Sequence, residues 1–275
     1  MKSDRRRATA RSLRFALVLA LLIQVTGGAT GAGEITGDHR LFRSFIEDGA
    51  IVQVGWLELA VSYTRQDAGR DLLAESIASF RVGEEFEAGF ILGLLDRRRE
   101  AGDMIFGAPI SQNINGAGLA DPRVFAKYRL LRSPVEMSVG AIATLPLGDE
   151  ERGRGAGSLR YEAFLGLRKR LTRVTLIGSA ALKRHDDSEG PGAAEGNTTA
   201  RIGIGAIVPL TRIWVLIAEA TYEGAPYGDE DDPAVLLLGL DWRPTENLAI
   251  RGAVAAGLTD PAPDLHALLS AAFNF

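Results

Sequence analysis

The sequence predicts an all-β protein, a transmembrane antiparallel up-and-down β-barrel of about 12 strands. Three observations predict this fold class: the chain begins like an exported protein, its middle alternates between apolar and polar residues with the period of a strand, and it ends on an aromatic residue. Mean hydropathy is close to zero. This excludes a protein of several membrane-spanning helices but suits barrel strands, because only one face of each strand is apolar.

Residues 1–32 are expected to be a secretory signal peptide. A basic start precedes a short apolar run at residues 15–23, and small residues follow at 27–33. The alternative is a membrane-anchoring helix, but the apolar run is only about half as long as a span of roughly 20 residues requires.

Residues 33–50 are expected to be a periplasmic leader or a plug segment. Leu41, Phe42, Phe45 and Ile46 have helical spacing, so a short amphipathic helix is predicted here. This helix would rest at the periplasmic mouth of the barrel or enter its lumen. A disordered leader is the third alternative.

Residues 51–275 are expected to form the outer-membrane barrel. Residues 123–130 illustrate the pattern, because charged Arg123, Lys127 and Arg129 alternate with uncharged residues. The predicted strands cover residues 51–63, 72–82, 85–94, 123–130, 135–147, 159–168, 174–182, 201–210, 214–223, 236–242, 248–258 and 265–275.

The predicted connections alternate between short turns and longer polar loops, as in bacterial outer-membrane barrels. Short turns are expected near 84, 133–134, 171–172, 211–212 and 244–247, and the other connections at 65–70, 96–121, 148–157, 185–198, 224–233 and 259–263. With an even number of strands, both chain ends lie on the short-turn, periplasmic side.

Aromatic residues gather near the predicted strand ends, where rings sit at lipid headgroups in membrane barrels. In the last strand, Phe273 and Phe275 lie on the apolar face and are expected to serve as the assembly signal. A soluble β-sandwich or barrel is the alternative, but the predicted strands are many and long, with almost no charge on their apolar faces. The other aromatic residues in this group are Tyr63, Phe86, Tyr128, Tyr161, Trp214, Tyr222 and Trp242.

Opposite the apolar faces, the strands carry charges of both signs that are expected to line the lumen. Such charges must be paired or hydrated, so the lumen is either filled with salt bridges or holds a polar path. The predicted lumen-lining residues are Glu58, Glu75, Arg81, Arg123, Lys127, Arg129, Glu136, Arg160, Glu162, Arg168, Arg201, Glu219, Asp241 and Arg251.

No catalytic, cofactor-binding or metal site is expected, and the protein is not expected to be an enzyme. The chain has no cysteine, and its three histidines are scattered and lack metal-ligand spacing. The net charge of −4 gives no basic surface for nucleic acid. The expected partners are outer-membrane lipid and lipopolysaccharide, the barrel assembly machinery and a small hydrophobic solute.

Residues 116–121 (GAGLAD) and 124–131 (VFAKYRLL) resemble a recurrent motif of the MetA-pathway of phenol degradation family, a set of transporter-like outer-membrane barrels. Members often carry a Gly-Leu-Gly-Asp turn before a strand that ends in Lys-Tyr-Arg, and Ala120 stands at the second glycine. Residues 144–148 (TLPLG) resemble the end of the family's next strand. The resemblance implies a channel or uptake role for small, often hydrophobic compounds in the bacterial outer membrane.

Two functions are therefore expected from the sequence. The first is a porin-like channel or transporter for uptake of small apolar or aromatic solutes. The alternative is a closed structural or surface-interacting outer-membrane barrel that transports nothing.

Overall fold

A computed structural model describes residues 39–66, 69–100, 104–105, 108–109, 113–150, 153–155, 157–185, 197–224, 232–260 and 262–275. The predicted signal peptide lies outside these residues. Among them, no helix is long and apolar enough to cross a membrane.

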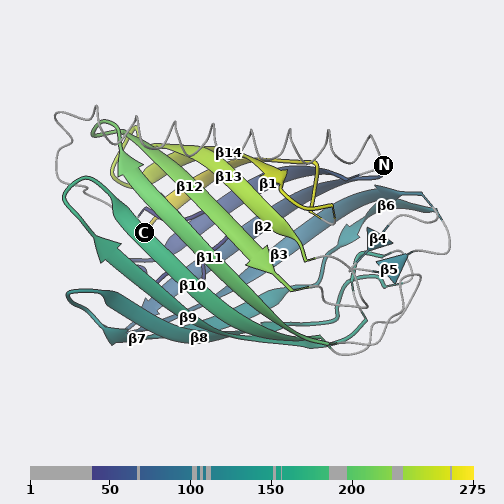
Figure 1. The fold of residues 1–275 in the computed structure, drawn as a ribbon, viewed down its shortest axis with the longest axis horizontal. Coiled ribbons are helices and arrows are strands. Elements are labelled where there is room, and N and C mark those ends of the chain that lie inside the picture. The colour runs from purple at the N-terminus through teal and green to yellow at the C-terminus, as the bar shows by residue number, and fades with distance from the viewer. Residues whose placement is uncertain are drawn as a thin grey trace.

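The described regular structure is a closed antiparallel barrel of β-strands (Figure 1). Each barrel strand pairs with its neighbours in the chain, and β15 pairs with β1 to close the barrel. The predicted fold class is therefore confirmed. The barrel strands are β1 (Trp56–Gln66), β2 (Gly69–Val82), β3 (Phe86–Arg99), β7 (Arg123–Leu131), β8 (Glu136–Thr144), β9 (Arg160–Arg170), β10 (Thr175–His185), β11 (Thr198–Pro209), β12 (Trp214–Glu223), β13 (Ala234–Trp242), β14 (Leu248–Gly257) and β15 (Leu265–Asn274).

The fourth barrel position is occupied by two strands in line, because β6 (Ile114–Leu119) and β7 both pair with β3. Pro122 lies in the break between them and lacks the N–H that a central strand donates. Residues 96–121 were predicted to be a loop; instead β3 continues to Arg99, and β6 pairs along it. Two short strands, β4 (Met104–Ile105) and β5 (Ala108–Pro109), pair with each other in the connection.

The outward face of the barrel is an apolar belt. In β1, Leu59 and Val61 are about half exposed, whereas Glu58 is buried; in β15, Leu269 is exposed and Ser270 is buried. Lipid is the solvent that suits such a surface. Other large apolar side chains exposed on the barrel strands are Leu72, Phe90, Leu92, Leu94, Val124, Leu130, Val139, Leu165, Leu176, Leu182, Ile202, Ile204, Leu240 and Val254.

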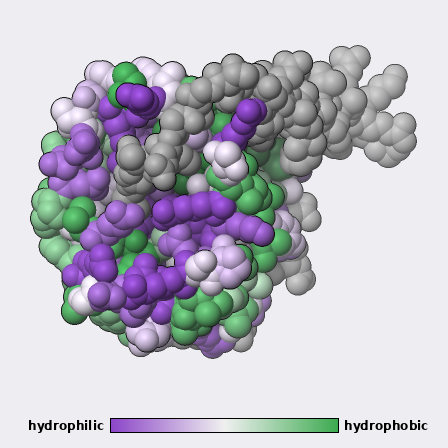
Figure 2. Space-filling model, turned by 90° about the vertical axis from the view of Figure 1, so that its left-hand side faces the viewer, coloured by the Kyte–Doolittle hydropathy of each residue, from purple (hydrophilic) through white to green (hydrophobic). Residues whose placement is uncertain are grey.

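The two ends of the barrel differ in their connections, as predicted. Turns at 83–85, 132–135, 171–174, 210–213 and 243–247 form the short-turn end. The opposite end, which we call the long-loop end, carries the connections 67–68, 100–113, 145–159, 186–197, 224–233 and 258–264. Figure 2 looks onto the short-turn end, where hydrophilic residues gather across the described face and hydrophobic residues lie mainly at its edge.

The first strand begins later than predicted. β1 starts at Trp56, and Ile51, the first residue of the predicted strand, is 3% exposed in the segment before β1. At the other end of the chain, the backbone of Phe275 exchanges hydrogen bonds with Gly55, with N···O distances of 2.8 and 3.0 Å. The rings of Phe273 and Phe275 are exposed on the outer face.

Candidate functional site

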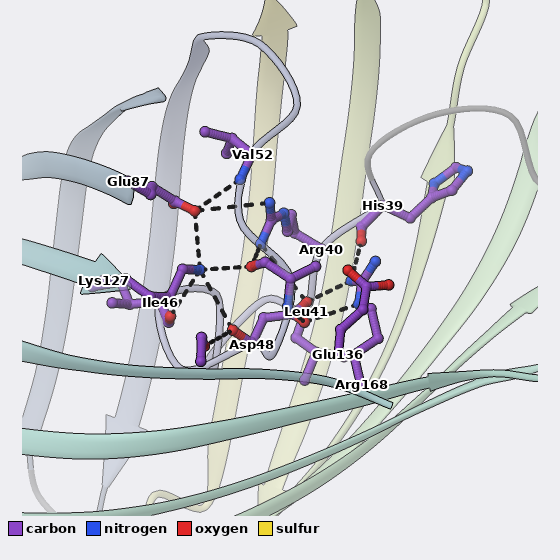
Figure 3. A network of polar contacts seen from close by, with 12 residues as sticks. His39, Arg40, Leu41, Ile46, Asp48, Val52, Glu87, Lys127, Glu136 and Arg168 are labelled. Carbon is purple, nitrogen blue, oxygen red and sulfur yellow. Dashed lines mark hydrogen bonds and ion pairs between the residues drawn. The ribbon is translucent and has the colours of Figure 1, made fainter. Parts of the chain in front are cut away.

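Residues 39–55, which we call the plug segment, run through the interior of the barrel in its short-turn half (Figure 3). Every residue from 39 to 52 is buried except Arg43. The segment is composed of turns and bends, so the amphipathic helix expected over residues 39–48 is wrong.

Apolar side chains of the plug segment pack against two different parts of the barrel wall. Leu41 and Phe42 join a buried cluster with Ile207, Ile217 and Leu237, from β11, β12 and β13. Phe45 and Ile46 pack against the opposite wall. Packing on two sides explains why no helix forms, because a helix would turn all its apolar side chains toward one wall.

On the opposite side, Phe45 and Ile46 join a second buried cluster with Ile91, Phe125 and Ile142, from β3, β7 and β8. The inward-facing apolar residues therefore fill the barrel together with the plug segment.

Glycines in the wall make room for the plug segment. A Cβ atom on Gly205 would lie 2.7 Å from Leu41, and one on Gly239 would lie 2.3 Å from the Phe42 ring. On β9, a Cβ on Gly166 would lie 2.3 Å from the carbonyl oxygen of Glu47. The absence of side chains at these positions lets the plug backbone and side chains approach the sheet.

Wall charges bind the plug backbone directly. The Nζ atom of Lys127 donates to the carbonyl oxygens of Ala50 at 2.8 Å and Ile46 at 3.3 Å, and its ammonium lies 3.0 Å from Glu87. Glu87 in turn accepts the N–H of Val52 at 2.8 Å. Figure 3 shows these contacts converging from β3 and β7.

A second wall carboxylate receives three consecutive backbone N–H groups. Glu219 on β12 accepts from Phe42, from Arg43 at 3.1 Å and from Ser44 at 3.2 Å. Hydrogen bonds to a charged acceptor are stronger than neutral ones, so this carboxylate holds the turn in the backbone at residues 42–44.

Two wall arginines complete the attachment. Arg168 on β9 donates to Asp48 at 2.9 Å and to the carbonyl of His39 at 2.6 Å. Arg251 on β14 donates to Glu58 at 2.7 Å and to the carbonyl of Leu41 at 3.2 Å. All of these charged groups are buried, and each has an opposite charge or several hydrogen-bond partners, as buried charges require.

The long-loop half of the barrel contains a cavity of about 560 Å³, which we call the vestibule. Its floor is the plug segment, from Phe42 to Glu47, and its walls are strands from most of the barrel. Apolar side chains, among them Leu73, Ile77, Leu95 and Leu268, alternate with charged ones on the walls. The vestibule is therefore amphipathic.

Charged wall residues of the vestibule form ion pairs between strands. The N···O distances are 3.0 Å for Arg123–Glu75, 3.0 Å for Arg160–Asp121, 3.2 Å for Arg97–Asp71, 2.6 Å for Arg201–Glu162 and 2.7 Å for Lys183–Glu223. Arg201 also pairs with Glu47 of the plug segment.

Arg43 is an exception among these cations. Its side chain is exposed in the vestibule floor, and its guanidinium makes no ion pair with any residue that the structure describes. Arg43 is therefore a plug-segment charge that faces the vestibule.

The predicted lumen-lining residues fall into three groups that do not form one site. Those around or beside the plug segment are Glu58, Lys127, Arg168, Glu219, Asp241 and Arg251. Those lining the vestibule are Glu75, Arg123, Arg160, Glu162 and Arg201. Those at the short-turn end are Arg81, which bonds to the carbonyl of Gly83, Arg129, which pairs with Glu85, and Glu136, which pairs with Arg170.

Several residues of the site were not predicted. Asp71 precedes the predicted strand at 72–82, and Arg97 lies in the predicted loop at 96–121. Charged residues next to both positions interrupt the apolar–polar alternation, so the strand ends were predicted too short. Lys183 comes directly after the predicted strand at residues 174–182, and β10 extends to His185, so its alternation continues to Lys183 and places it on the lumen side. No sequence pattern singles out Arg40 or Asp48, because their roles come from contacts with distant strands, Arg40 with Glu87 on β3 and Asp48 with Arg168 on β9. The exposure of Arg43 to the vestibule likewise follows from the path of the plug segment.

No family model and no curated protein sequence matches the chain. The resemblance to the MetA-pathway of phenol degradation family therefore stays a prediction. No three histidine, aspartate or glutamate side chains in the described part of the chain are arranged to hold a metal ion.

Solved structures do match the barrel. The COG4313 outer membrane channel from Pseudomonas putida F1 matches with a TM-score of 0.60 at 10% identity, over 81% of this chain and 94% of that chain. The NanC porin matches with 0.56 at 9% identity, over 80% and 100%. The KdgM porin in complex with oligogalacturonate matches with 0.51 at 9% identity, over 79% and 99%.

Identities this low show the fold alone. The chain has the fold of outer-membrane porins and channels. This fold, together with the apolar outer belt, is consistent with the predicted location in the bacterial outer membrane.

Proposed function

We propose that the protein is an outer-membrane channel for uptake of small solutes, in which the plug segment controls passage. The observation that carries this proposal is the vestibule of about 560 Å³, which ends on the plug segment. A cavity of this size holds a small organic molecule. The channel fold of the structural neighbours supports the same reading.

The solutes we propose are small and have an apolar or aromatic part. Leu73, Ile77, Leu95 and Leu268 give the vestibule apolar walls, and Phe42 and Phe45 add aromatic rings at the floor. A purely hydrophilic solute would leave these surfaces in contact with water, whereas an apolar group would cover them. The resemblance to a family linked to uptake of hydrophobic compounds supports the same class.

A closed structural barrel is the second candidate. The observation that favours it is the attachment of the plug segment by Lys127, Glu219 and Arg168, which together bind its backbone and Asp48. In this case the vestibule would be a recess without an exit.

Conductance separates the two candidates. The full chain in planar lipid bilayers should give small, resolvable currents in KCl, and Glu219→Gln should raise them. An amide accepts the three N–H groups less strongly than a carboxylate, so the plug segment is held less tightly.

Glu84→Gln is the matched control. It makes the same change in the same barrel, but Glu84 lies in an exposed turn of the short-turn end, where it pairs with Arg132. Absence of current from both the wild type and Glu219→Gln would reject the channel and leave the closed barrel.

Solute preference is tested by current block. Benzyl alcohol should reduce the current at lower concentration than glucose, because its ring covers the apolar walls of the vestibule. Leu73→Ser and Leu268→Ser should weaken the block by benzyl alcohol and leave the block by glucose unchanged. Equal block by both solutes in the wild type would reject an apolar preference while leaving the channel itself intact.

A further inference from the structure

Three arginines form a row on the outer face of the barrel at the long-loop end. Arg65 on β1 lies directly opposite Arg70 on β2, and Arg70 lies directly opposite Arg98 on β3. All three side chains are exposed and, by the alternation of their strands, point away from the lumen. We call them the arginine row.

Like charges directly opposite each other on neighbouring strands destabilise a sheet. Within the described chain, Arg98 has one carboxylate nearby, Asp96 at 3.6 Å, and neither Arg65 nor Arg70 makes an ion pair. The row therefore carries an excess of positive charge over the described carboxylates that pair with it. Cross-strand arginines elsewhere in the barrel are different, since Arg123, Arg160 and Arg201 each face a carboxylate.

The row lies at the border of the apolar belt. Nearer the middle of the barrel, the next outward-facing positions on β1 and β2 are Tyr63, which is half-buried, and Leu72, which is exposed. On β3, Leu94 is 61% exposed below Asp96. This level, where apolar side chains give way to polar ones, is where lipid headgroups meet a membrane protein.

The surface at the row is hollowed. One recess of about 390 Å³ is lined by Tyr63, all three arginines and Arg99, with one carboxylate, Glu100, and with Asn115 of β6. A second recess of about 210 Å³ is lined by Tyr63, Leu72, Arg70 and Arg98, and also by two carboxylates that have arginine partners, Asp71 with Arg97 and Asp96 with Arg98. The recesses therefore lie between the arginine side chains and the border of the apolar belt at Tyr63 and Leu72.

We propose that the arginine row binds the phosphate groups of a phosphorylated glycolipid in the outer leaflet. Guanidinium groups pair with phosphate through two parallel N–H···O bonds, and three of them side by side match a lipid headgroup that carries more than one phosphate. The acyl chains of the same lipid would cover Leu72 and Leu94. The long-loop end is the outer side in barrels of this fold.

The test is the thermal stability of the full chain in phosphatidylcholine vesicles with and without bisphosphorylated lipid A. The readout is the temperature at which the protein loses its compact, heat-modifiable gel migration. Lipid A should raise this temperature for the wild type by several degrees, and inorganic phosphate at millimolar concentration should not.

The triple variant Arg65→Gln/Arg70→Gln/Arg98→Gln should lose the stabilisation by lipid A. In vesicles without lipid A it should be at least as stable as the wild type, because the repulsion between the arginines is gone. A variant that merely misfolds would lose stability in both kinds of vesicle, so the two results are distinct.

The matched control is Lys169→Gln/Arg173→Gln/Arg212→Gln, which removes the same charge from exposed positions at the short-turn end. It should retain the response to lipid A. The proposal is overturned if the arginine-row variant keeps the full response, if the control loses it equally, or if inorganic phosphate reproduces it. The test does not depend on transport, so it remains valid whether or not the barrel conducts.

Discussion

The two halves of the barrel interior use charged residues in opposite ways. In the short-turn half, Lys127, Glu219 and Arg168 are buried and bind the backbone and a side chain of the plug segment. In the long-loop half, arginine–carboxylate pairs such as Arg123–Glu75 connect strands, here β7 and β2, around the vestibule. Charged residues of the same types, on the same inward face, therefore hold the plug segment in one half and surround the vestibule in the other.

This difference indicates that the contribution of a lumen charge to stability depends more on how deeply the charge is buried than on its position on the inward face. A buried charge that loses its partner costs several kcal/mol, whereas a hydrated ion pair contributes little. Removal of charges should accordingly damage the short-turn half far more than the long-loop half.

Removing a buried wall charge should have the largest effect. Lys127→Met deletes the donor to the plug carbonyls and leaves Glu87 buried without its 3.0 Å cation. We expect a loss of about 3–5 kcal/mol in the free energy that holds the plug segment. Hydrogen exchange of residues 39–52 in micelles measures this loss as faster exchange.

Lys183→Met is the matched comparison in the vestibule. Its ammonium pairs with Glu223 at 2.7 Å but remains partly exposed. The expected loss is about 0–1 kcal/mol, with exchange of residues 39–52 unchanged. Similar losses from Lys127→Met and Lys183→Met would show that the two halves do not differ.

Filling a wall glycine should have the next largest effect. In Gly205→Ala, the new Cβ lies 2.7 Å from Leu41, so the plug segment must shift. Overpacking of this kind costs about 1–3 kcal/mol, which should appear as faster proteolysis within residues 39–52. Gly178→Ala on β10 is the control, because a Cβ there meets no atom within 4 Å, and it should leave proteolysis unchanged.

Breaking a vestibule ion pair should have a small effect. A double-mutant cycle with Arg123→Gln and Glu75→Gln should give a coupling of about 0–1 kcal/mol in urea unfolding, because the Arg123 side chain is 40% exposed. A coupling of several kcal/mol would mean that the vestibule is as dry as the plugged half.

Neutralising Arg43 should change stability little and alter mainly conduction. Arg43→Gln removes a positive charge from the vestibule floor at a side chain that has no described ion pair to lose. The reversal potential in a KCl gradient should shift toward cation selectivity. Arg212→Gln, at an exposed turn of the short-turn end, should not shift it.

Strand alternation predicted most of the barrel because each strand contacts lipid on one face and the lumen on the other. Ile91, Phe125, Ile142 and Phe164 alternate with outward-facing residues in the predicted strands, and all four are buried. The period of two residues is a local property, so it is readable without knowing which strands pair.

The conformation of the plug segment could not be predicted from local sequence patterns, because it depends on contacts with distant residues. Helical spacing of Leu41, Phe42, Phe45 and Ile46 suggested a helix, but Glu219, 175 to 177 residues away in the chain, binds the N–H groups of residues 42–44. Tertiary contacts of this kind override local propensity. The extension of β3 and β6 was missed for a similar reason, since a glycine-rich segment becomes a strand when a long neighbour pairs with it.

The backbone bonds between Gly55 and Phe275 have a consequence for the order of assembly. β1 begins immediately after the plug segment and forms the closing seam of the cylinder with β15, whose pairing starts at Trp56 and Asn274. Joining the two ends of so long a chain is a late, slow event. The segment that occupies the interior is thus continuous with the strand at the seam. We therefore expect closure of the cylinder and burial of residues 39–55 to be coupled during assembly.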